Sequence, residues 1–330
     1  MAASQSVAIT YVPADCGSII PGKSKAPQAF RDAGIVTRLA DRGVSTVTEH
    51  EALSAPATHS VAKMGPRGVR NEELNIEVCK QVHSTISDNL RGAPHEAGGP
   101  LPFQLILGGE CCMSPAIMSA FWQHQQDGKR VGLMYIDADL DLASPTDPGS
   151  TGVFAGMNCA NLLGFPGTLE SMKQFSRAHG GGFNPVCDSS NLVFFGTNMT
   201  AGACPGNKTE HFAHLFDNNF KVVSAASVER DPAGRAEEAL RFLQDQVDVI
   251  LVHLDVDSID PVSFPLANVP NYTGVQFESM MQALSVFMAS SKVAALTIAE
   301  VNPDHDPSGS MVRTWTDRVT AMLAARGHTS

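Results

Sequence analysis

The sequence predicts one α/β domain in which helices cover both faces of a mostly parallel β-sheet. Two observations lead to this fold class. Short apolar runs alternate with longer helical patterns along the 330 residues, and acidic residues directly follow several of the apolar runs. Because α/β proteins place their sites where parallel strands end, acidic strand ends fit this architecture. No segment has the length or composition of an interdomain linker, so we expect a single domain over residues 1–330.

The strands are predicted from short, continuous apolar runs, which are typical of strands buried on both faces of a parallel sheet. In chain order these runs are Val7–Val12, Phe103–Leu107, Val131–Ile136, Leu192–Phe195, Val222–Ser224, Val249–Leu254 and Ala295–Ala299. Helices are predicted between them from amphipathic spacing, as in the stripe formed by Leu74, Val78, Val82, Ile86 and Leu90. The expected helices span residues 70–91, 115–126, 154–163, 208–216, 234–245, 276–290 and 311–325.

Composition and charge exclude several classes of protein. The chain is 43% hydrophobic and 17% charged, which is ordinary for a globular protein, and its formal net charge is −11. This charge argues against nucleic acid or an anionic membrane surface as the main partner. No apolar run reaches the length of a membrane span, and the first residues lack the basic and apolar regions of a signal peptide. With seven cysteines in no framework spacing, we expect a cytoplasmic protein with reduced thiols that acts on a small molecule.

The apolar run 131–136 leads into three aspartates at alternate positions, Asp137, Asp139 and Asp141. In an extended chain this spacing places them on one side, although Asp141 already stands where a loop is expected. Carboxylates so close together repel one another unless a cation lies among them. A lone pattern of this kind is more often a solvated, acidic turn.

A second strand end changes that interpretation. The run 249–254 is followed by Asp255 and Asp257, so two separate strands bring carboxylates to the same edge of the predicted sheet. Oxygen ligands suit hard divalent cations, namely Mg²⁺, Mn²⁺ or Ca²⁺. We therefore predict a metal centre formed by five acidic residues, Asp137, Asp139, Asp141, Asp255 and Asp257.

Two further strand ends complete a pattern that resembles a known family. The sequence GGEC (residues 108–111) follows the run 103–107, and EVNP (residues 300–303) follows the run 295–299. The ureohydrolase family of arginases and agmatinases carries GGDH, DAHxD, DxDxxDP and ExNP in chain order. This sequence shows GGEC, DADLD, DVDSIDP and EVNP in the same order and at suitable intervals. The resemblance covers nearly the whole chain.

The resemblance implies a three-layer α/β/α fold with two Mn²⁺ ions bridged by hydroxide, which attacks a guanidinium carbon and releases urea. On the matching motif positions, Asp137 and Asp255 would bridge the two metals, and Asp141 and Asp257 would each bind one. Glu300 would hold the substrate guanidinium, because a carboxylate matches its planar fork of donors. Metal coordination is needed because free water, with a pKa of about 15.7, yields little hydroxide. The resemblance also implies a homo-oligomer, commonly a trimer or hexamer.

The sequence departs from the family at both histidine ligands. Cys111 stands at the histidine of GGDH, and Asp139 stands at the histidine of DAHxD. Each replacement is able to bind a metal, cysteine as a thiolate and aspartate as a hard oxygen donor. The alternatives are a buried thiol for Cys111 and a solvated acid for Asp139. A cluster of carboxylates carries more negative charge than the family's site, so we expect either a shift in selectivity toward Mg²⁺ or a weak or empty site.

Further departures concern the substrate. Ala155 stands where arginases carry a proton-shuttling histidine, and Ala143 replaces an asparagine that binds the substrate carboxylate. Ser150 or Thr151 preserves a hydroxyl nearby, and both are candidate substrate-binding residues. We therefore expect a guanidine or amidine-type substrate other than L-arginine.

Three more residues are candidates for supporting roles. His253 precedes Asp255 by two residues in the same predicted strand, and we expect it to hold a metal-bound carboxylate rather than the metal. Glu110, at the end of another strand, is a second candidate for such support. His305, in the loop after the last strand, is a candidate catalytic residue that replaces the missing proton shuttle, with a solvated histidine as the alternative.

Three functions remain open from the sequence. The first is metal-dependent hydrolysis of a non-peptide C–N bond in a guanidine or amidine-type compound. The second is a Mg²⁺-dependent reaction on a phosphate or diphosphate group, which requires basic residues near the metal. Lys23, Lys129 and Arg130 are the few such residues near the motifs, and none stands at a strand end. The third is a catalytically inactive, metal-free member of the family that serves as an interaction subunit.

Overall fold

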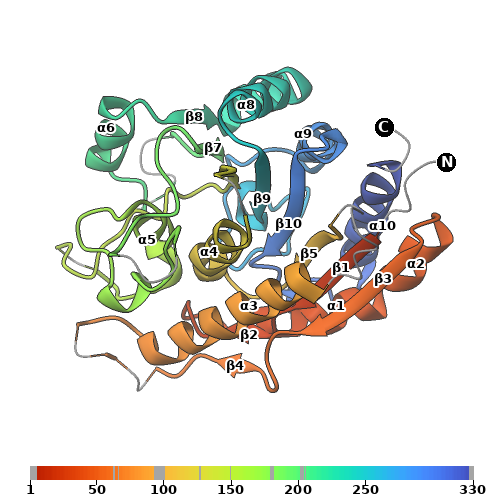
Figure 1. The fold of residues 1–330 in the computed structure, drawn as a ribbon, viewed down its shortest axis with the longest axis horizontal. Coiled ribbons are helices and arrows are strands. Elements are labelled where there is room, and N and C mark those ends of the chain that lie inside the picture. The colour runs from red at the N-terminus through yellow and green to blue at the C-terminus, as the bar shows by residue number, and fades with distance from the viewer. Residues whose placement is uncertain are drawn as a thin grey trace.

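A computed structural model describes residues 6–61, 64–65, 67–92, 101–125, 128–148, 150–178, 182–200, 204 and 206–326. Within these residues the centre of the protein is an eight-stranded sheet whose paired strands all run parallel. In their order across the sheet, the strands are β3 (Thr46–Glu51), β1 (Ser6–Tyr11), β5 (Phe103–Leu107), β10 (Val293–Ala299), β9 (Val249–Asp255), β6 (Val131–Ile136), β7 (Leu192–Thr197) and β8 (Lys221–Ser224) (Figure 1). The predicted parallel sheet is confirmed.

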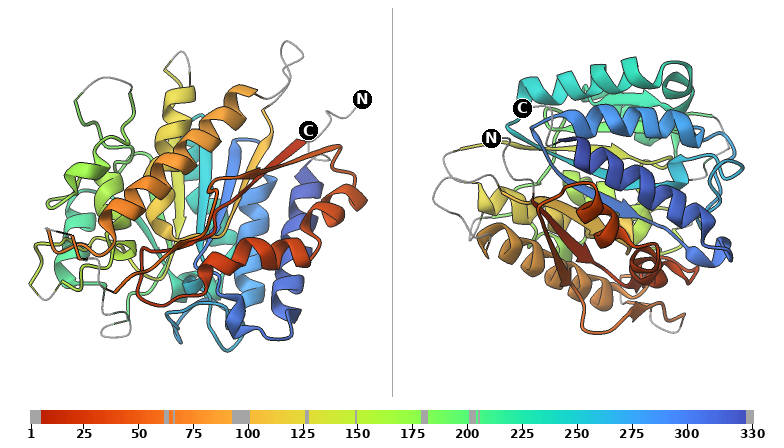
Figure 2. Two further views of the ribbon diagram at one scale, coloured as in Figure 1. Left: turned by 90° about the horizontal axis from the view of Figure 1, so that it is seen from below. Right: turned by 90° about the vertical axis from the view of Figure 1, so that its right-hand side faces the viewer.

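Helices cover both faces of this sheet and give the three layers that the family resemblance implied. On one face lie α3 (Glu72–Gly92) and α4 (Ser114–His124), and on the other lie α8 (Pro232–Gln246), α9 (Phe277–Ala289) and α10 (Ser310–Ala325). In the right-hand view of Figure 2, α8 and α9 lie above the sheet and α3 lies below it. None of the helices in these described ranges is both long and apolar enough to cross a membrane.

The remaining elements are shorter. The helices are α1 (Ala26–Asp32), α2 (Ile35–Asp41), α5 (Asn158–Leu163), α6 (Thr209–Asp217) and α7 (Ala225–Arg230), and a small second sheet pairs β2 (Ala14–Asp15) with β4 (Ala57–Thr58). Single 3-10 turns are η1 (Lys23–Lys25), η2 (Cys111–Met113), η3 (Ala155–Met157), η4 (Glu170–Met172), η5 (Val256–Ser258) and η6 (Pro303–His305).

Two apolar clusters hold the layers together. In β5 the consecutive residues Leu105 and Ile106 join different clusters, as the two-residue period of a strand requires. The cluster under α9 and α10 contains the buried Trp315, and the cluster under α3 and α4 contains the buried Phe121. Because both faces are covered, the central strands are apolar at nearly every position, and this is why they were predictable from apolar runs.

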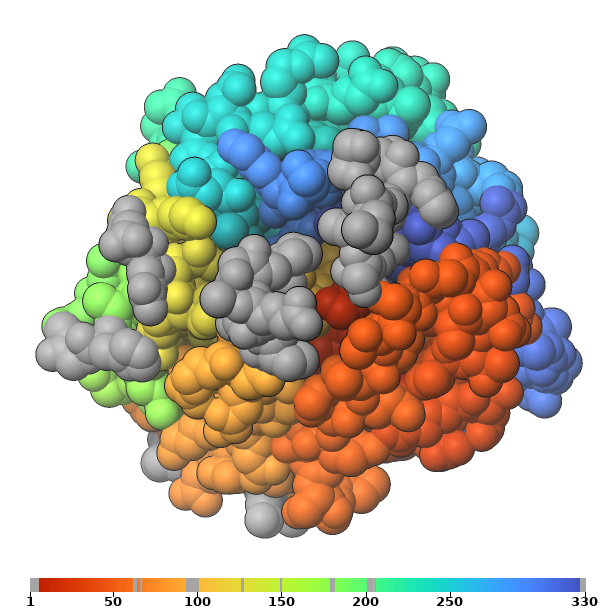
Figure 3. Space-filling model, turned by 45° about the vertical axis from the view of Figure 1, so that its right-hand side comes forward, coloured from red at the N-terminus to blue at the C-terminus, as the bar shows by residue number. Residues whose placement is uncertain are grey.

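The seven predicted strands are present, and their bounds differ from the prediction by at most two residues. Strand β3 was not predicted, because its segment TVTEHE lies at the edge of the sheet and its side chains are exposed or half-buried. The short helices α1, α2 and α7 were also not predicted. Among them, α2 packs against α10, where Arg38 and Arg42 each lie 2.7 Å from Asp317, so the first and last parts of the chain lie side by side (Figure 3).

Candidate metal centre

The candidate site lies where four neighbouring strands of the described sheet end. Cys111 follows β5, Glu300 follows β10, Asp255 ends β9 and Asp137 follows β6. Although β5 and β6 are consecutive strands along the chain, β10 and β9 lie between them in the sheet. Segments far apart in sequence therefore converge at one edge of the sheet, which is where open α/β sheets bind their ligands.

Three buried carboxylates form the centre of this site. Asp137, Asp255 and Asp257 each offer an oxygen, and these oxygens lie within 4.8 Å of one another. Backbone amides fix the three side chains. The amide of Asp139 donates to Asp137 Oδ1 at 2.7 Å, that of Asp257 donates to Asp255 Oδ1 at 2.8 Å, and that of Ala138 donates to Asp257 Oδ1 at 3.3 Å. The structure thus brings together the two strand ends on which the predicted metal centre depends.

Asp139 and Asp141 line the same cavity from a loop. Because β6 ends before Asp137, the extended geometry expected for Asp137 and Asp139 is absent, and that part of the prediction is wrong, whereas Asp141 lies in a loop as expected. Asp141 Oδ2 accepts a hydrogen bond from the Tyr135 hydroxyl at 2.6 Å, and Asp139 Oδ1 accepts one from the Cys204 thiol at 2.9 Å. The loop nevertheless directs all three carboxylates to one cavity.

Two residues of the site have a left-handed backbone that side chains disfavour. The φ angles are 50° at Asp141 and 63° at Glu300. For residues other than glycine, such a conformation costs on the order of 1–3 kcal/mol and persists only where the surroundings fix it. Strain of this kind is concentrated at functional sites, and both residues line the cavity.

Burial raises the pKa of the clustered carboxyl groups. The pKa values of Asp137, Asp255 and Asp257 lie well above the usual range, because the groups are buried and because neighbouring carboxylates repel their charge. Burial likewise raises the pKa of Asp139 and, together with the charge of Asp139, that of Asp141. A divalent cation among these groups would favour their ionised forms and reverse the shifts.

Without metal, the free energy of unfolding is expected to decrease as the pH rises. In the unfolded chain an aspartate has a pKa of about 3.9, so it loses its proton as the pH rises past that value. In the folded protein the same carboxyl group has a raised pKa and stays protonated to a higher pH. The stability that this difference in pKa contributes is fully present below the pKa of the unfolded chain, and it is lost as the pH rises through the pKa of the folded protein. Thermal unfolding in the presence of a chelator, followed from about pH 5 to about pH 8, measures this loss. The same slope in a variant carrying Asp255→Asn and Asp257→Asn would contradict the assignment.

The thiol of Cys111 lies within the carboxylate cluster. Its Sγ is 2.8 Å from Asp255 Oδ2 and 3.9 Å from Asp137 Oδ2, and burial together with Asp255 raises its pKa well above the usual range. The Nε2 atom of His253 lies 3.0 Å from this sulfur, and the Nδ1 atom lies 3.1 Å from Ser114 Oγ. Burial lowers the pKa of His253 to about 3, so its imidazole is neutral. His253 therefore contacts the thiol, where the sequence predicted a contact with a carboxylate.

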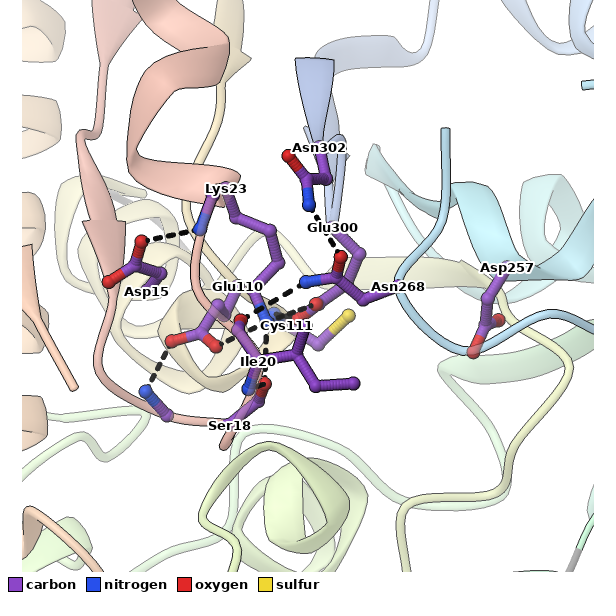
Figure 4. Close-up of polar contacts among 12 residues, drawn as sticks. Asp15, Ser18, Ile20, Lys23, Glu110, Cys111, Asp257, Asn268, Glu300 and Asn302 are labelled. Carbon is purple, nitrogen blue, oxygen red and sulfur yellow. Dashed lines mark hydrogen bonds and ion pairs between the residues drawn. The ribbon is translucent and has the colours of Figure 1, made fainter. Parts of the chain in front are cut away.

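A buried lysine lies beside Glu300. The Nζ atom of Lys23 is 2.8 Å from Glu110 Oε1, 3.0 Å from Glu300 Oε2 and 2.7 Å from Ser18 Oγ (Figure 4). Burial opposes the charge of Lys23, but Glu300 and Glu110 outweigh it and raise its pKa. The other oxygen of Glu300 accepts a hydrogen bond from the amide of Cys111 at 3.2 Å. These contacts hold the Glu300 carboxylate in one orientation.

Two more predicted site residues, Glu110 and His305, do not line the cavity. Glu110 is buried behind it, where it contacts Lys23 and accepts a hydrogen bond from the amide of Gly17, and burial raises its pKa to about 6. His305 is exposed in η6, and its Nε2 atom lies 3.5 Å from the side-chain amide of Asn302. The structure therefore does not bring His305 to the metal-site candidates, and Glu110 supports Glu300 through Lys23.

The cavity has a volume of about 540 Å³ and is lined by Cys111, Glu300 and the five predicted aspartates, whereas His253 lies outside its lining. Ser150 and Thr151 line it, as do Ala143 and Ala155. Apolar side chains contribute to the lining as well, among them Ile19, Ile20 and Val269, which are 55%, 37% and 56% exposed. The cavity thus combines an acidic site at the strand ends with exposed apolar walls.

Three polar residues at this site were not predicted from the sequence. Lys23 comes from a turn before α1, Cys204 contacts Asp139, and Lys208 lines the cavity with its Nζ atom 2.8 Å from Asp147 Oδ2. All three stand in turns or loops rather than at the end of an apolar run, so the pattern that located the aspartates gave no sign of them.

The fold and the strand-end site define this chain as a three-layer α/β protein with its candidate site at the carboxyl ends of parallel strands. The family model described as "Arginase family" matches residues 5–328. Arginase of Bacillus caldovelox is 22% identical over 298 residues, which cover 90% of this chain and 91% of that protein. Its solved structure superposes with a TM-score of 0.79 at 20% identity and covers 98% of each chain. Proclavaminate amidino hydrolase from Streptomyces clavuligerus superposes with a TM-score of 0.67 at 15% identity, covering 99% of this chain and 93% of that chain.

The chain belongs to the arginase family, and the resemblance seen in its four motifs is confirmed. Its donor set also fits the divalent metal that the family implies. Asp137, Asp255 and Asp257 supply closely spaced oxygens, and Cys111 and His253 supply sulfur and nitrogen beside them. The raised pKa values of the buried carboxyl groups are those of a cluster in need of a compensating positive charge.

Proposed function

We propose that this protein is a metal-dependent hydrolase of a non-peptide C–N bond in a guanidine or amidine-type compound other than L-arginine. The observation that supports it is the convergence of three buried aspartates and Glu300 on one cavity of an arginase-family fold. A divalent ion held by Asp137, Asp255 and Asp257, either Mn²⁺ or Mg²⁺, would supply hydroxide near neutral pH.

Glu300 is the proposed anchor for the cationic head of the substrate. It lines the cavity, and Lys23 and the amide of Cys111 fix its two oxygens. One ammonium group lies beside two carboxyl groups, those of Glu110 and Glu300, so it can compensate only one of their negative charges. A fixed carboxylate with surplus negative charge favours a guanidinium or amidinium group beside it.

The remainder of the substrate is proposed to be apolar. Ala143 and Ala155 provide no polar contact at the positions where arginases are expected to bind a carboxylate and to transfer a proton. Apolar surface is exposed on the cavity lining at Ile19, Ile20 and Val269. An amino-acid head group would lose its hydrogen bonds with water here without gaining equivalent ones. Proclavaminate amidino hydrolase shares the fold, which supports amidino hydrolysis of a molecule other than arginine on this scaffold.

The test is turnover of a guanidine panel by metal-reconstituted protein, with detection of released urea or ammonia. Guanidines and amidines with an apolar substituent are expected to react, whereas L-arginine is expected to react slowly or not at all. General acid–base help is typically worth roughly 10²–10⁴ in rate, so the loss of a shuttle at Ala155 alone would be severe. Turnover of L-arginine at rates typical of arginases would overturn the proposal.

The role of Glu300 has a separate test. Glu300→Gln is expected to abolish turnover of the best panel substrate while the metal content, measured by elemental analysis, stays unchanged. Glu170→Gln is the matched control, because Glu170 is a surface residue that pairs with Lys173 and does not line the cavity, and it should change neither quantity. Loss of metal in Glu300→Gln would assign Glu300 to the metal instead.

Phosphate chemistry gains no support from the structure. The lysines that line the cavity, Lys23 and Lys208, both bind carboxylates, Lys23 at Glu110 and Glu300 and Lys208 at Asp147. A phosphate group would have to compete with these partners for each ammonium group.

A further inference from the structure

We infer that Cys111 and His253 are metal ligands, and that one metal position in this site is a sulfur–nitrogen–oxygen site that selects Zn²⁺ over Mn²⁺ and Mg²⁺. This assignment deepens the proposed function. It rests on the proposed function in one respect, which is that a divalent ion binds at these strand ends. It replaces the expectation, drawn from the number of carboxylates, that selectivity moves toward Mg²⁺.

The donor atoms already have the spacing of a metal site. Cys111 Sγ lies 3.0 Å from His253 Nε2, 2.8 Å from Asp255 Oδ2 and 3.9 Å from Asp137 Oδ2. Donors from Cys111, Asp137 and His253 all lie within 4.8 Å of one another, and all three residues are buried. Around tetrahedral zinc, with Zn–S of about 2.3 Å and Zn–N of about 2.0 Å, neighbouring ligand atoms lie about 3.5 Å apart. The observed separations bracket this value.

The imidazole of His253 is held with an unprotonated nitrogen toward the sulfur. Ser114 Oγ donates its proton to the carbonyl oxygen of Cys111 at 2.9 Å, so toward His253 Nδ1, at 3.1 Å, it acts as an acceptor. The neutral ring then carries its proton on Nδ1, and Nε2 presents a lone pair to the site. The ring also stacks on Tyr135, with centroids 4.9 Å apart and planes 6° from parallel. A metal-bound histidine typically has its other nitrogen fixed in this way.

The chemistry of these donors decides which ion is preferred. Thiolate and imidazole suit Zn²⁺ and Co²⁺, whereas Mg²⁺ and Mn²⁺ prefer carboxylate and water oxygens. When the ion binds, the Cys111 thiol loses its proton to solvent and the thiolate takes its place in the ligand shell. Asp137 contributes an oxygen to this position, and Asp255 and Asp257 remain for an adjacent, harder position.

Cobalt titration of metal-free protein tests the inference directly, because Co²⁺ bound to a thiolate has a near-ultraviolet charge-transfer band that carboxylate-bound Co²⁺ lacks. The wild-type protein is expected to show the band, and Cys111→Ser is expected to lose it. Cys112→Ser is the matched control, since this neighbouring buried thiol contacts Asn75 at 3.5 Å rather than the carboxylates, and the band should remain.

Affinity and selectivity give a second readout that does not depend on one variant. His253→Ala is expected to weaken Zn²⁺ binding by more than about 100-fold, because loss of a group that only orients a ligand already costs about 10–100-fold. Dialysis of wild-type protein against equal concentrations of Zn²⁺ and Mn²⁺ should leave mainly Zn²⁺ bound. Cobalt binding without the band, or a preference for Mn²⁺, overturns the inference and leaves the hydrolase proposal intact. A band without turnover of any guanidine supports the inference and overturns the hydrolase proposal.

Discussion

Replacing Lys23 by methionine is expected to lower the free energy of unfolding by about 3–5 kcal/mol, the typical effect of breaking a buried ion pair by removing one partner. Lys23 is fully buried, and its ammonium group is the cation beside Glu110, which is also buried. Methionine keeps much of the side-chain volume but leaves the two carboxylates without their partner. Urea unfolding of both proteins, monitored by circular dichroism, measures the difference.

Two variants make this result specific. Lys25→Met, two residues along the same turn, removes a lysine that binds Asp304 on the surface with 60% of its side chain exposed, so it should change stability by no more than about 1 kcal/mol. Adding Glu110→Gln to Lys23→Met should restore part of the lost stability, because it removes the uncompensated buried charge. Equal effects of Lys23→Met and Lys25→Met would contradict the structural role of the buried cation.

Divalent metal is expected to raise the melting temperature of chelator-treated protein. An ion that binds the folded chain alone stabilises it by mass action, by about 2.7 kcal/mol at a concentration one hundred times its Kd. The effect should be large here because the ion also removes the mutual repulsion of Asp137, Asp255 and Asp257. Thermal unfolding across titrations of Zn²⁺, Mn²⁺ and Mg²⁺ measures the gain.

The double variant Asp255→Asn, Asp257→Asn is the control for this effect. It should melt at a higher temperature than the wild type when both are metal-free, since two charges that repel their neighbours are gone. It should also lose the response to metal, because two oxygen donors have been removed. A wild-type melting curve that does not move in excess metal would favour the metal-free interaction subunit over the hydrolase.

The central sheet was predictable because burial on both faces leaves an unambiguous mark on the sequence. Strands such as Val131–Ile136 consist almost entirely of apolar residues, because the side chains on both faces of the strand pack against a layer of helices. The edge strand Thr46–Glu51 follows no such rule, since its side chains are exposed or half-buried and the strand pairs with β1. Its sequence, TVT followed by EHE, does not distinguish a strand from a loop.

The site was predictable to the extent that strand ends define it. The aspartates after β6 and β9 follow apolar runs, so their convergence could be predicted from topology alone. The partner of His253 could not be predicted in this way. The histidine shares a strand with Asp255, but the sulfur it contacts comes from the turn after β5, and β10 lies between those two strands. Such a contact depends on how a turn packs against the sheet, and this packing produces no periodic pattern in the sequence.

In the described part of the chain β3 is an edge strand, and its edge has a consequence for how copies of this chain can associate. Glu49 and Glu51 project from this strand and form ion pairs with Arg31 of α1, whose guanidinium lies 3.6 Å from the centre of the Tyr11 ring. A foreign strand that docked here would have to bury these charges or break their pairing. Charged, partly covered edges of this kind protect sheets against edge-to-edge aggregation. We therefore expect that copies which assemble do so through their helical and loop surfaces, and that β3 does not template a continuous intermolecular sheet.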